Sequence, residues 1–236
     1  MIERSVVAAP LAVAVVAKAP RPGQVKTRLC PPLSLENAAE LGGAFLRDTV
    51  ERVRRLEGVQ VVIAYTPTED RELFEGICPG VVLVPQTDGD LGRRLADIFA
   101  TLCARGVRAV VAVGADTPTL PLAFVLEAFA RLDEGADVVL GPAEDGGYYL
   151  IGLRKLHRAL FEGIPWSTER VFADTLDRAE RAGLNLATLP RWRDVDTFAD
   201  LAHLAKGFEG ATEHADHTRS RLIDLGLLRS GASAAP

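Results

Sequence analysis

One acidic residue follows an apolar run in a way that indicates a metal ligand. Asp116 lies in the stretch VGADTPTLP (113–121), immediately after a run of valines and alanines. A carboxylate at the end of a buried strand is costly to desolvate unless it is capped, paired or bound to a metal. Magnesium favours such a position, because it takes one or two protein carboxylates and fills its shell with water and substrate phosphate. An Asx-turn of Asp116 with the following backbone is the competing interpretation.

A second acidic cluster lies further along the chain, in RDVDTFADL (193–201). Asp194 and Asp196 fall on the same side of an extended segment, just before a predicted helix. Thr197 and Asp200 have the spacing of a weak capping box, which explains those two residues as a helix start. That interpretation leaves Asp196 without a role.

The stretch AKAPRPGQVKTRL (17–29) gathers basic residues around a glycine, directly after the apolar run LAVAVVA. It lacks the first glycine of a P-loop, and it does not have the glycine pattern of a dinucleotide-binding fold. What remains is a loop in which Gly23 is free to adopt a positive φ and several cations could contact an anion. These cations are Lys18, Arg21, Lys26 and Arg28. A phosphate site and a solvated basic turn both stay open on these residues alone.

A glycine pair marks a turn in GPAEDGGYYLIGL (141–153). Asp-Gly or Gly-Gly between apolar segments is a strong hairpin signal. Two adjacent glycines, Gly146 and Gly147, would also let a substrate approach the backbone closely, so a turn and a binding site are compatible interpretations.

These motifs must be positioned by the elements between them. Continuous valine-rich runs predict strands buried on both faces at 11–17, 59–65, 81–85, 108–114 and 137–141. Helical patterns cover 35–56, 90–106, 121–131 and 168–182. The alternation indicates an α/β fold with a mostly parallel sheet between helices. Ligands in such sheets bind beyond the carboxyl ends of the strands, where the motifs above fall.

Length and composition fit one large domain. The chain has 236 residues, 48% of them hydrophobic, which is enough for a substantial core. We expect a single domain over 1–210 and a polar C-terminal tail over 211–236, in which His214 and His217 indicate a solvated surface. The net charge of −5 argues against a nucleic-acid or anionic-membrane partner.

The remaining composition points to the cytoplasm. The three cysteines form no C-x-x-C pair, which fits a reducing compartment better than a disulfide framework or a zinc site. The N-terminal apolar stretch contains Pro10 and ends at Lys18, so it is too short for a membrane span. Lys18 and Arg21 occupy the place of a signal-peptide cleavage site, so we expect no export.

Five segments together carry a family resemblance: AKAPRPGQVKTRL, GADTPTLP, GPAEDGGYYLIGL, IPWST and DVDTFADL, in this order. The chain resembles, over about residues 11–205, the bacterial glycosyltransferase-like transferases, also called radical-SAM/selenodomain-associated. That family belongs to the nucleotide-diphospho-sugar transferase superfamily, and it is similar to phospholactate guanylyltransferases and molybdenum-cofactor guanylyltransferases. The resemblance implies a GT-A-type three-layer sandwich: a mostly parallel sheet, helices on both faces, and an antiparallel excursion near 141–153.

The resemblance also implies roles for residues of each motif. Lys26 and Arg28, with Arg21, match the basic loop that holds nucleotide phosphates, and Asp116 and Asp196 match two metal-binding acids. Nucleotide contacts are implied at Ala17, Lys18, Arg21, Gly23, Lys26, Gln86, Gly89 and Gly92. Acceptor or sugar contacts are implied at Glu144, Asp145, Gly146, Gly147, Trp166 and Ser167.

Two chemistries fit these residues, both requiring Mg²⁺ or Mn²⁺. In nucleotidyl transfer, a phosphate or carboxylate of a small acceptor attacks the α-phosphorus of a nucleoside triphosphate and pyrophosphate leaves. In glycosyl transfer from a nucleotide-diphospho-sugar, a base deprotonates the acceptor hydroxyl, and Glu144 or Asp145 are candidates.

We favour nucleotidyl transfer because the first loop is basic where a triphosphate would lie. The expected catalytic residues are Lys26, Arg28, Asp116 and Asp145. A non-catalytic nucleotide-binding module is a third alternative, but its signature would be missing metal acids, and both are present. The oligomeric state stays open.

Overall fold

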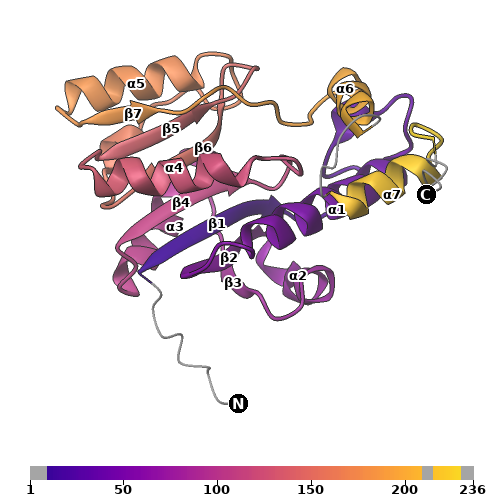
Figure 1. The fold of residues 1–236 in the computed structure, drawn as a ribbon, viewed down its shortest axis with the longest axis horizontal. Coiled ribbons are helices and arrows are strands. Elements are labelled where there is room, and N and C mark those ends of the chain that lie inside the picture. The colour runs from indigo at the N-terminus through magenta and orange to yellow at the C-terminus, as the bar shows by residue number, and fades with distance from the viewer. Residues whose placement is uncertain (1–9, 209–214, 230–236) are drawn as a thin grey trace, which may run out of the picture.

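The computed structural model describes residues 10–208 and 215–229, which form a seven-stranded sheet covered by helices (Figure 1). The order across the sheet is β3-β2-β1-β4-β6-β5-β7. The strands are β1 (Leu11–Lys18), β2 (Val59–Thr66), β3 (Val82–Pro85), β4 (Ala109–Gly114), β5 (Val138–Pro142), β6 (Tyr148–Leu153) and β7 (Leu186–Thr188).

Only β6 of these strands runs against the rest. It pairs antiparallel with β4 on one side and with β5 on the other, whereas the other neighbouring strands pair in parallel. The turn between β5 and β6 carries the glycine pair of the predicted hairpin. The structure therefore confirms the expected α/β fold, including the antiparallel excursion near 141–153.

Helices cover both faces of the sheet and make three layers. The α-helices of the described residues are α1 (Leu35–Val53), α2 (Arg71–Ile77), α3 (Leu91–Ala104), α4 (Leu122–Asp133), α5 (Val171–Arg181), α6 (Phe198–Phe208) and α7 (Asp216–Asp224). Side chains of α1, α2 and α4 pack with one face of the sheet, and those of α3 and α5 pack with the other. The predicted N-cap of α3 is present, since Asp90 accepts a hydrogen bond from the amide of Arg93 at 2.8 Å.

The strand sequence explains why the sheet is buried on both sides. Successive side chains of a strand point to opposite faces. In β1, Val13 and Val15 belong to the core under α1 and α4, while Ala12 and Ala14 belong to the core under α3 and α5. An unbroken apolar run is thus what a strand between two helical layers requires.

A third, smaller core lies beyond the carboxyl edge of the sheet. It joins α1, α6, α7 and a short 3-10 helix, η1 (Thr27–Leu29), around Leu29, Phe45 and Leu201. Val195 is also buried in this core. The third core therefore fixes both the basic loop, which ends at η1, and the acidic segment around residue 195.

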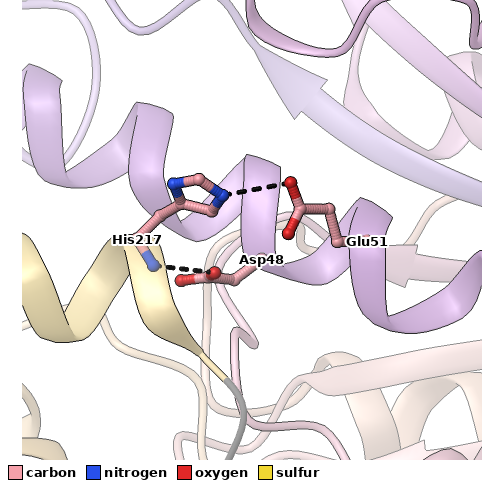
Figure 2. A group of neighbouring side chains, drawn as sticks. All are labelled: Asp48, Glu51 and His217. Atoms are coloured by element: carbon pink, nitrogen blue, oxygen red, sulfur yellow. Dashed lines mark hydrogen bonds and ion pairs between the residues drawn. The ribbon is translucent and has the colours of Figure 1, made fainter.

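Helix α7 corrects the expectation of a polar tail over 211–236. It docks on α1 through Asp48, whose carboxylate accepts a hydrogen bond from the amide of His217 at 3.1 Å (Figure 2). The same carboxylate accepts a second hydrogen bond from the amide of Thr218 at 2.7 Å. Burial raises the pKa of Asp48, although these hydrogen bonds oppose the shift. His217 lies 3.0 Å from Glu51 instead of pointing into solvent. A polar sequence can dock in this way because its first-turn amides find a buried carboxylate cap.

The rest of the predicted tail, 209–214 and 230–236, lies outside the described residues, as does His214. Among the helices that the structure describes, none has the length and apolar character needed to cross a membrane.

Candidate functional site

A cleft of about 420 Å³ opens at the carboxyl edge of the sheet. Its walls include four segments that are distant in sequence, the loop after β1, the end of β4, strand β6 and the acidic segment before α6, together with residues of α1 and α3. Its polar and charged lining includes Lys18, Lys26, Arg28, Asp116, Asp194 and Asp196. The motifs singled out in the sequence thus converge where parallel sheets bind their ligands.

Lys26 is the centre of this arrangement. Its Nζ lies 2.9 Å from Asp116 Oδ2 and 2.7 Å from Asp196 Oδ1. Only 12% of the Lys26 side chain is exposed. Burial alone lowers the pKa of Lys26, but the two carboxylates outweigh it and hold this pKa above its ordinary value. Lys26 therefore keeps its proton and its positive charge while it lies between the two acids.

Asp194 adds a third carboxylate. Carboxylate oxygens of Asp116, Asp194 and Asp196 all lie within 4.8 Å of one another. Burial, followed by the negative charges of Asp116, Asp196 and Asp145, raises the pKa of Asp194 to about 7. Asp194 was not among the predicted metal ligands. Its position on the same side of the extended segment as Asp196 was the signal that could have identified it.

The three carboxylates suit a hard divalent cation. They carry three formal negative charges when ionised, and Lys26 compensates only one of them at close range. Oxygen-only donors are the ligands that Mg²⁺ and Mn²⁺ prefer. The donor set of Asp116, Asp194 and Asp196 therefore fits the expected metal.

Backbone geometry holds these side chains in place. Lys26 has φ 50°, in the left-handed region that non-glycine residues rarely adopt, directly before η1. On the acidic side, the amide of Val195 donates to Asp116 O at 3.1 Å, which ties the acidic segment to the end of β4. The predicted capping box is present, since Thr197 and Asp200 each accept a hydrogen bond from the other's amide.

The other cations of the first loop divide into two groups. Lys18 and Arg28 line the cleft, and Arg28 lies 3.4 Å from Asp196. Arg21 does not line it, because its guanidinium forms a bidentate ion pair with the buried carboxylate of Asp70. This hydrogen bonding holds the pKa of Asp70 below its usual range. The structure thus gives Arg21 a role in fixing the loop, and the expected phosphate contact of Arg21 stays a prediction.

Gly23 and Ala17 also shape the loop without lining the cleft. Gly23 has φ +73° in the turn, as its sequence context predicted. Ala17 is buried in β1, and its carbonyl accepts a hydrogen bond from the side-chain amide of Gln86 at 3.3 Å. The same amide group donates to Ala64 O at 2.6 Å, so the buried Gln86 side chain bridges β1 and β2.

Gly92 has a packing role at the start of α3. A Cβ at Gly92 would lie 2.6 Å from Nε1 of Trp166 and would also overlap the carbonyl of Phe161. The helix can approach Trp166 this closely only because residue 92 has no side chain. Gly89, with φ +127°, lies in the turn before the helix. Neither glycine lines the cleft, and Leu91 and Leu95 of α3 line it instead.

The β5–β6 turn lies beside the cleft. Asp145 Oδ1 accepts a hydrogen bond from the amide of Gly147 at 2.9 Å, and the charge of Asp145 reaches Asp194. Gly146 packs against the backbone of Glu169, with φ +89°. Glu144 faces a separate hollow of about 310 Å³, where it forms an ion pair with Arg193.

The aromatic wall of the cleft comes from β6. Tyr148 and Tyr149 line the cleft, and neither was singled out in the sequence as a site residue. Trp166 packs edge-on against Tyr148, with ring centroids 6.3 Å apart, and stands behind the wall. Ser167 is exposed, with φ +65°. Successive side chains of a strand point to opposite faces, and this alternation along β6 was the signal that could have identified Tyr148.

Comparisons with solved structures support the fold assignment. A protein from Desulfovibrio desulfuricans G20, assigned provisionally to the nucleotide-diphospho-sugar transferases, is 31% identical, with a TM-score of 0.84 over 92% of this chain and 96% of that one. CMP:2-keto-3-deoxy-manno-octonic acid synthetase, solved with CTP, is 15% identical, with a TM-score of 0.56 over 84% of this chain and 98% of that one.

A third structure, 4-diphosphocytidyl-2C-methyl-D-erythritol synthase from Anaerococcus prevotii DSM 20548, is 11% identical, with a TM-score of 0.58 over 85% of this chain and 99% of that one. The last two likenesses show a shared fold alone. No curated protein matches the sequence. A family model described as "Uncharacterized protein conserved in bacteria (DUF2064)" matches residues 49–168, just over half of the chain. Together with the relative from Desulfovibrio, this match shows that the chain belongs to that bacterial family.

Proposed function

We propose that the protein is a metal-dependent transferase that acts on an activated nucleotide. The observation that carries the proposal is the convergence of Lys26, Asp116 and Asp196 at the carboxyl edge of the sheet. The relative at 31% identity is described as a nucleotide-diphospho-sugar transferase, and a more distant structure with this fold was solved with CTP. A site of carboxylates and cations is what a metal–polyphosphate complex requires.

Nucleotidyl transfer is the reaction that the charges favour. Lys18 and Arg28 line the cleft and could hold phosphates, while the carboxylates of Asp116, Asp194 and Asp196 would hold Mg²⁺ or Mn²⁺. The metal would neutralise charge on the phosphates. An ionised phosphate or carboxylate of a small acceptor would attack the α-phosphorus, forming a new P–O bond as the bond to pyrophosphate breaks. No general base is needed, because the acceptor oxygen is already ionised.

Glycosyl transfer is the second candidate, and one position favours it. Asp145 lies in the β5–β6 turn, just before strand β6, which lines the cleft, and its charge acts on Asp194, which supports a role near the acceptor. There it could take the proton from an acceptor hydroxyl while a nucleoside diphosphate leaves. The description of the relative from Desulfovibrio supports this alternative.

Product analysis separates the two reactions. The purified protein would be incubated with Mg²⁺, the four nucleoside triphosphates, pooled nucleotide sugars and pooled small acceptors. Acceptor-dependent release of pyrophosphate supports nucleotidyl transfer, and release of nucleoside diphosphate supports glycosyl transfer. Asp116→Asn should abolish either activity, whereas Glu57→Gln, on the exposed loop before β2, should not. Unchanged turnover in Asp116→Asn would contradict the metal assignment.

A further inference from the structure

The ammonium group of Lys26 lies where two candidate metal ligands converge. It is 2.9 Å from Asp116 Oδ2 and 2.7 Å from Asp196 Oδ1. The two aspartate side chains are 31% and 33% exposed and line the cleft, so a cation in the cleft can reach them. The lysine thus stands where a bound cation would be expected.

A metal ion cannot take Asp116 Oδ2 and Asp196 Oδ1 as ligands while the ammonium of Lys26 lies between them. A magnesium ion approaches its oxygen ligands to about 2.0–2.1 Å, closer than an ammonium group does. Two cations held by the same oxygens would also repel each other strongly in a partly buried site. Binding of the metal therefore requires Lys26 to move.

We propose that Lys26 is a displaceable occupant of the metal site: its ammonium leaves Asp116 and Asp196 when a divalent cation binds. The inference rests on the proposed function, because the metal is part of that function. The lysine can move because its charge is carried on a flexible four-carbon stem. Lys26 is the residue directly before the short helix η1, in a loop at the rim of the cleft.

The displacement couples the metal to the nucleotide. Without a polyphosphate, the displaced ammonium loses two carboxylate partners and gains none, so the free metal binds weakly. A polyphosphate in the cleft offers Lys26 a new anionic partner, beside Lys18 and Arg28. Metal and polyphosphate then strengthen each other's binding, and the strengthening is reciprocal.

Manganese binding to the protein without nucleotide tests the proposal directly. Free Mn²⁺ would be titrated by electron paramagnetic resonance against the wild type and Lys26→Met. We expect Lys26→Met to bind Mn²⁺ about tenfold more tightly, because no ammonium competes for the carboxylates. Adding tripolyphosphate should tighten Mn²⁺ binding in the wild type more than in Lys26→Met.

Arg28 supplies a matched control. It belongs to the same loop and lies 3.4 Å from Asp196, but 67% of its side chain is exposed. Removing an exposed charge changes local electrostatics little, so Arg28→Met should shift the Mn²⁺ affinity about threefold at most. An equal change in Mn²⁺ affinity in Lys26→Met and Arg28→Met would overturn the proposal. Such a result would mean that the affinity follows the net charge of the loop, and not the presence of an ammonium group in the metal site.

Chemical labelling tests the same displacement in the unaltered protein. Acetic anhydride modifies free amines, and the lysine held by two carboxylates should react slowly. Mass spectrometry would compare Lys26 with the exposed Lys155 as an internal reference, with and without Mn²⁺. We expect Mn²⁺ to increase the labelling of Lys26 several-fold and to leave Lys155 unchanged. Labelling of Lys26 that does not respond to bound Mn²⁺ would overturn the proposal.

The two hypotheses fail in different ways. If Mn²⁺ does not bind in a manner sensitive to Asp116→Asn, then the metal assignment of the proposed function is wrong, and the displacement falls with it. If Mn²⁺ binds through Asp116 but with equal affinity in Lys26→Met and the wild type, then only the displacement is wrong.

Discussion

Gly114 and Asp116 are in such close contact that the carboxylate folds back over the glycine: a Cβ on residue 114 would overlap Asp116 Oδ1. The last residue of β4 thus sets the direction of the acid that follows it. A side chain at residue 114 would therefore force the Asp116 carboxylate to shift from its present position beside Lys26.

Gly114→Ala should therefore weaken metal binding without touching a ligand. The added methyl group pushes the Asp116 carboxylate away from Lys26, and loss of a supporting contact of this kind costs about tenfold or more in metal affinity. Mn²⁺ titration measures the effect. Gly76→Ala is the control, because a Cβ there meets nothing within 4 Å. Equal Mn²⁺ affinity in Gly114→Ala and the wild type would show that Asp116 reaches the site without this close approach.

Asp194→Asn should stabilise the metal-free protein at neutral and higher pH. Burial and three neighbouring carboxylates raise the pKa of Asp194 to about 7, well above its value in an unfolded chain. Folding therefore disfavours the ionised form, and the free energy of unfolding falls as the pH rises from about 4 to 7. Asparagine does not ionise, so the free energy of unfolding of Asp194→Asn does not fall in this way. The variant should be more stable than the wild type by roughly 2 kcal/mol at pH 8.

Thermal and urea unfolding in the presence of a chelator measure the effect of Asp194→Asn. The wild type and the variant should differ least near pH 3, where the carboxyl group is protonated in the folded state and mostly protonated in the unfolded state. Glu57→Gln, on the exposed loop before β2, is the matched neutralisation and should not change the pH profile. A difference in the free energy of unfolding that does not depend on pH would contradict the raised pKa of Asp194 and its assigned cause, burial beside other carboxylates. Saturating Mg²⁺ should reverse the order, because only the wild type keeps all three carboxylate ligands.

Gly92→Ala should destabilise the fold through packing. The new methyl group meets Trp166 and the Phe161 carbonyl, and overpacking of this kind costs about 2 kcal/mol. Equilibrium unfolding gives the magnitude, and the fluorescence of Trp166 reports the local change. Gly207→Ala in α6 meets nothing within 4 Å and should be neutral or slightly stabilising. Wild-type stability in Gly92→Ala would mean that α3 can shift away from Trp166 at no cost.

Asp48→Ala should release α7 from α1. Two backbone amides at the start of α7 lose their acceptor, which costs about 2 kcal/mol for a buried cap. Hydrogen exchange over residues 216–224 should accelerate more than exchange in α4. Glu51→Gln removes only the exposed contact to His217, so it should leave the exchange of α7 nearly unchanged. If exchange in α7 is the same in Asp48→Ala and the wild type, other contacts hold the helix, among them the packing of Leu222 and the ion pair of Arg221 with Glu40.

The parts that could be predicted from the sequence depend on local chemistry. Valine-rich runs predicted five strands, and Asp90 and the Thr197–Asp200 pair predicted helix starts, because both signals lie within a few residues. Asp116 and Lys26 stood out for the same reason: each follows an apolar strand that ends at the ligand-binding edge.

The parts that could not be predicted depend on partners far along the chain. Arg21 was expected at phosphates, but it pairs with Asp70, and no spacing within one motif reveals such a contact. Helix α7 is polar in sequence, and it docks because Asp48 caps it from α1. The pKa of Asp194 is raised by burial and by Asp116 and Asp196, and only the folded chain provides both.

The third core has a consequence for synthesis of the chain on the ribosome. Lys26 and Asp196 are 170 residues apart, and both are anchored through a core that Leu222 of α7 helps to close. A nascent chain that has exposed β1 to β6 can already build most of the sheet, yet its basic loop still lacks the acids opposite it. The charged centre therefore assembles last, after residues 194–228 have left the exit tunnel, and partly made chains carry no complete metal site.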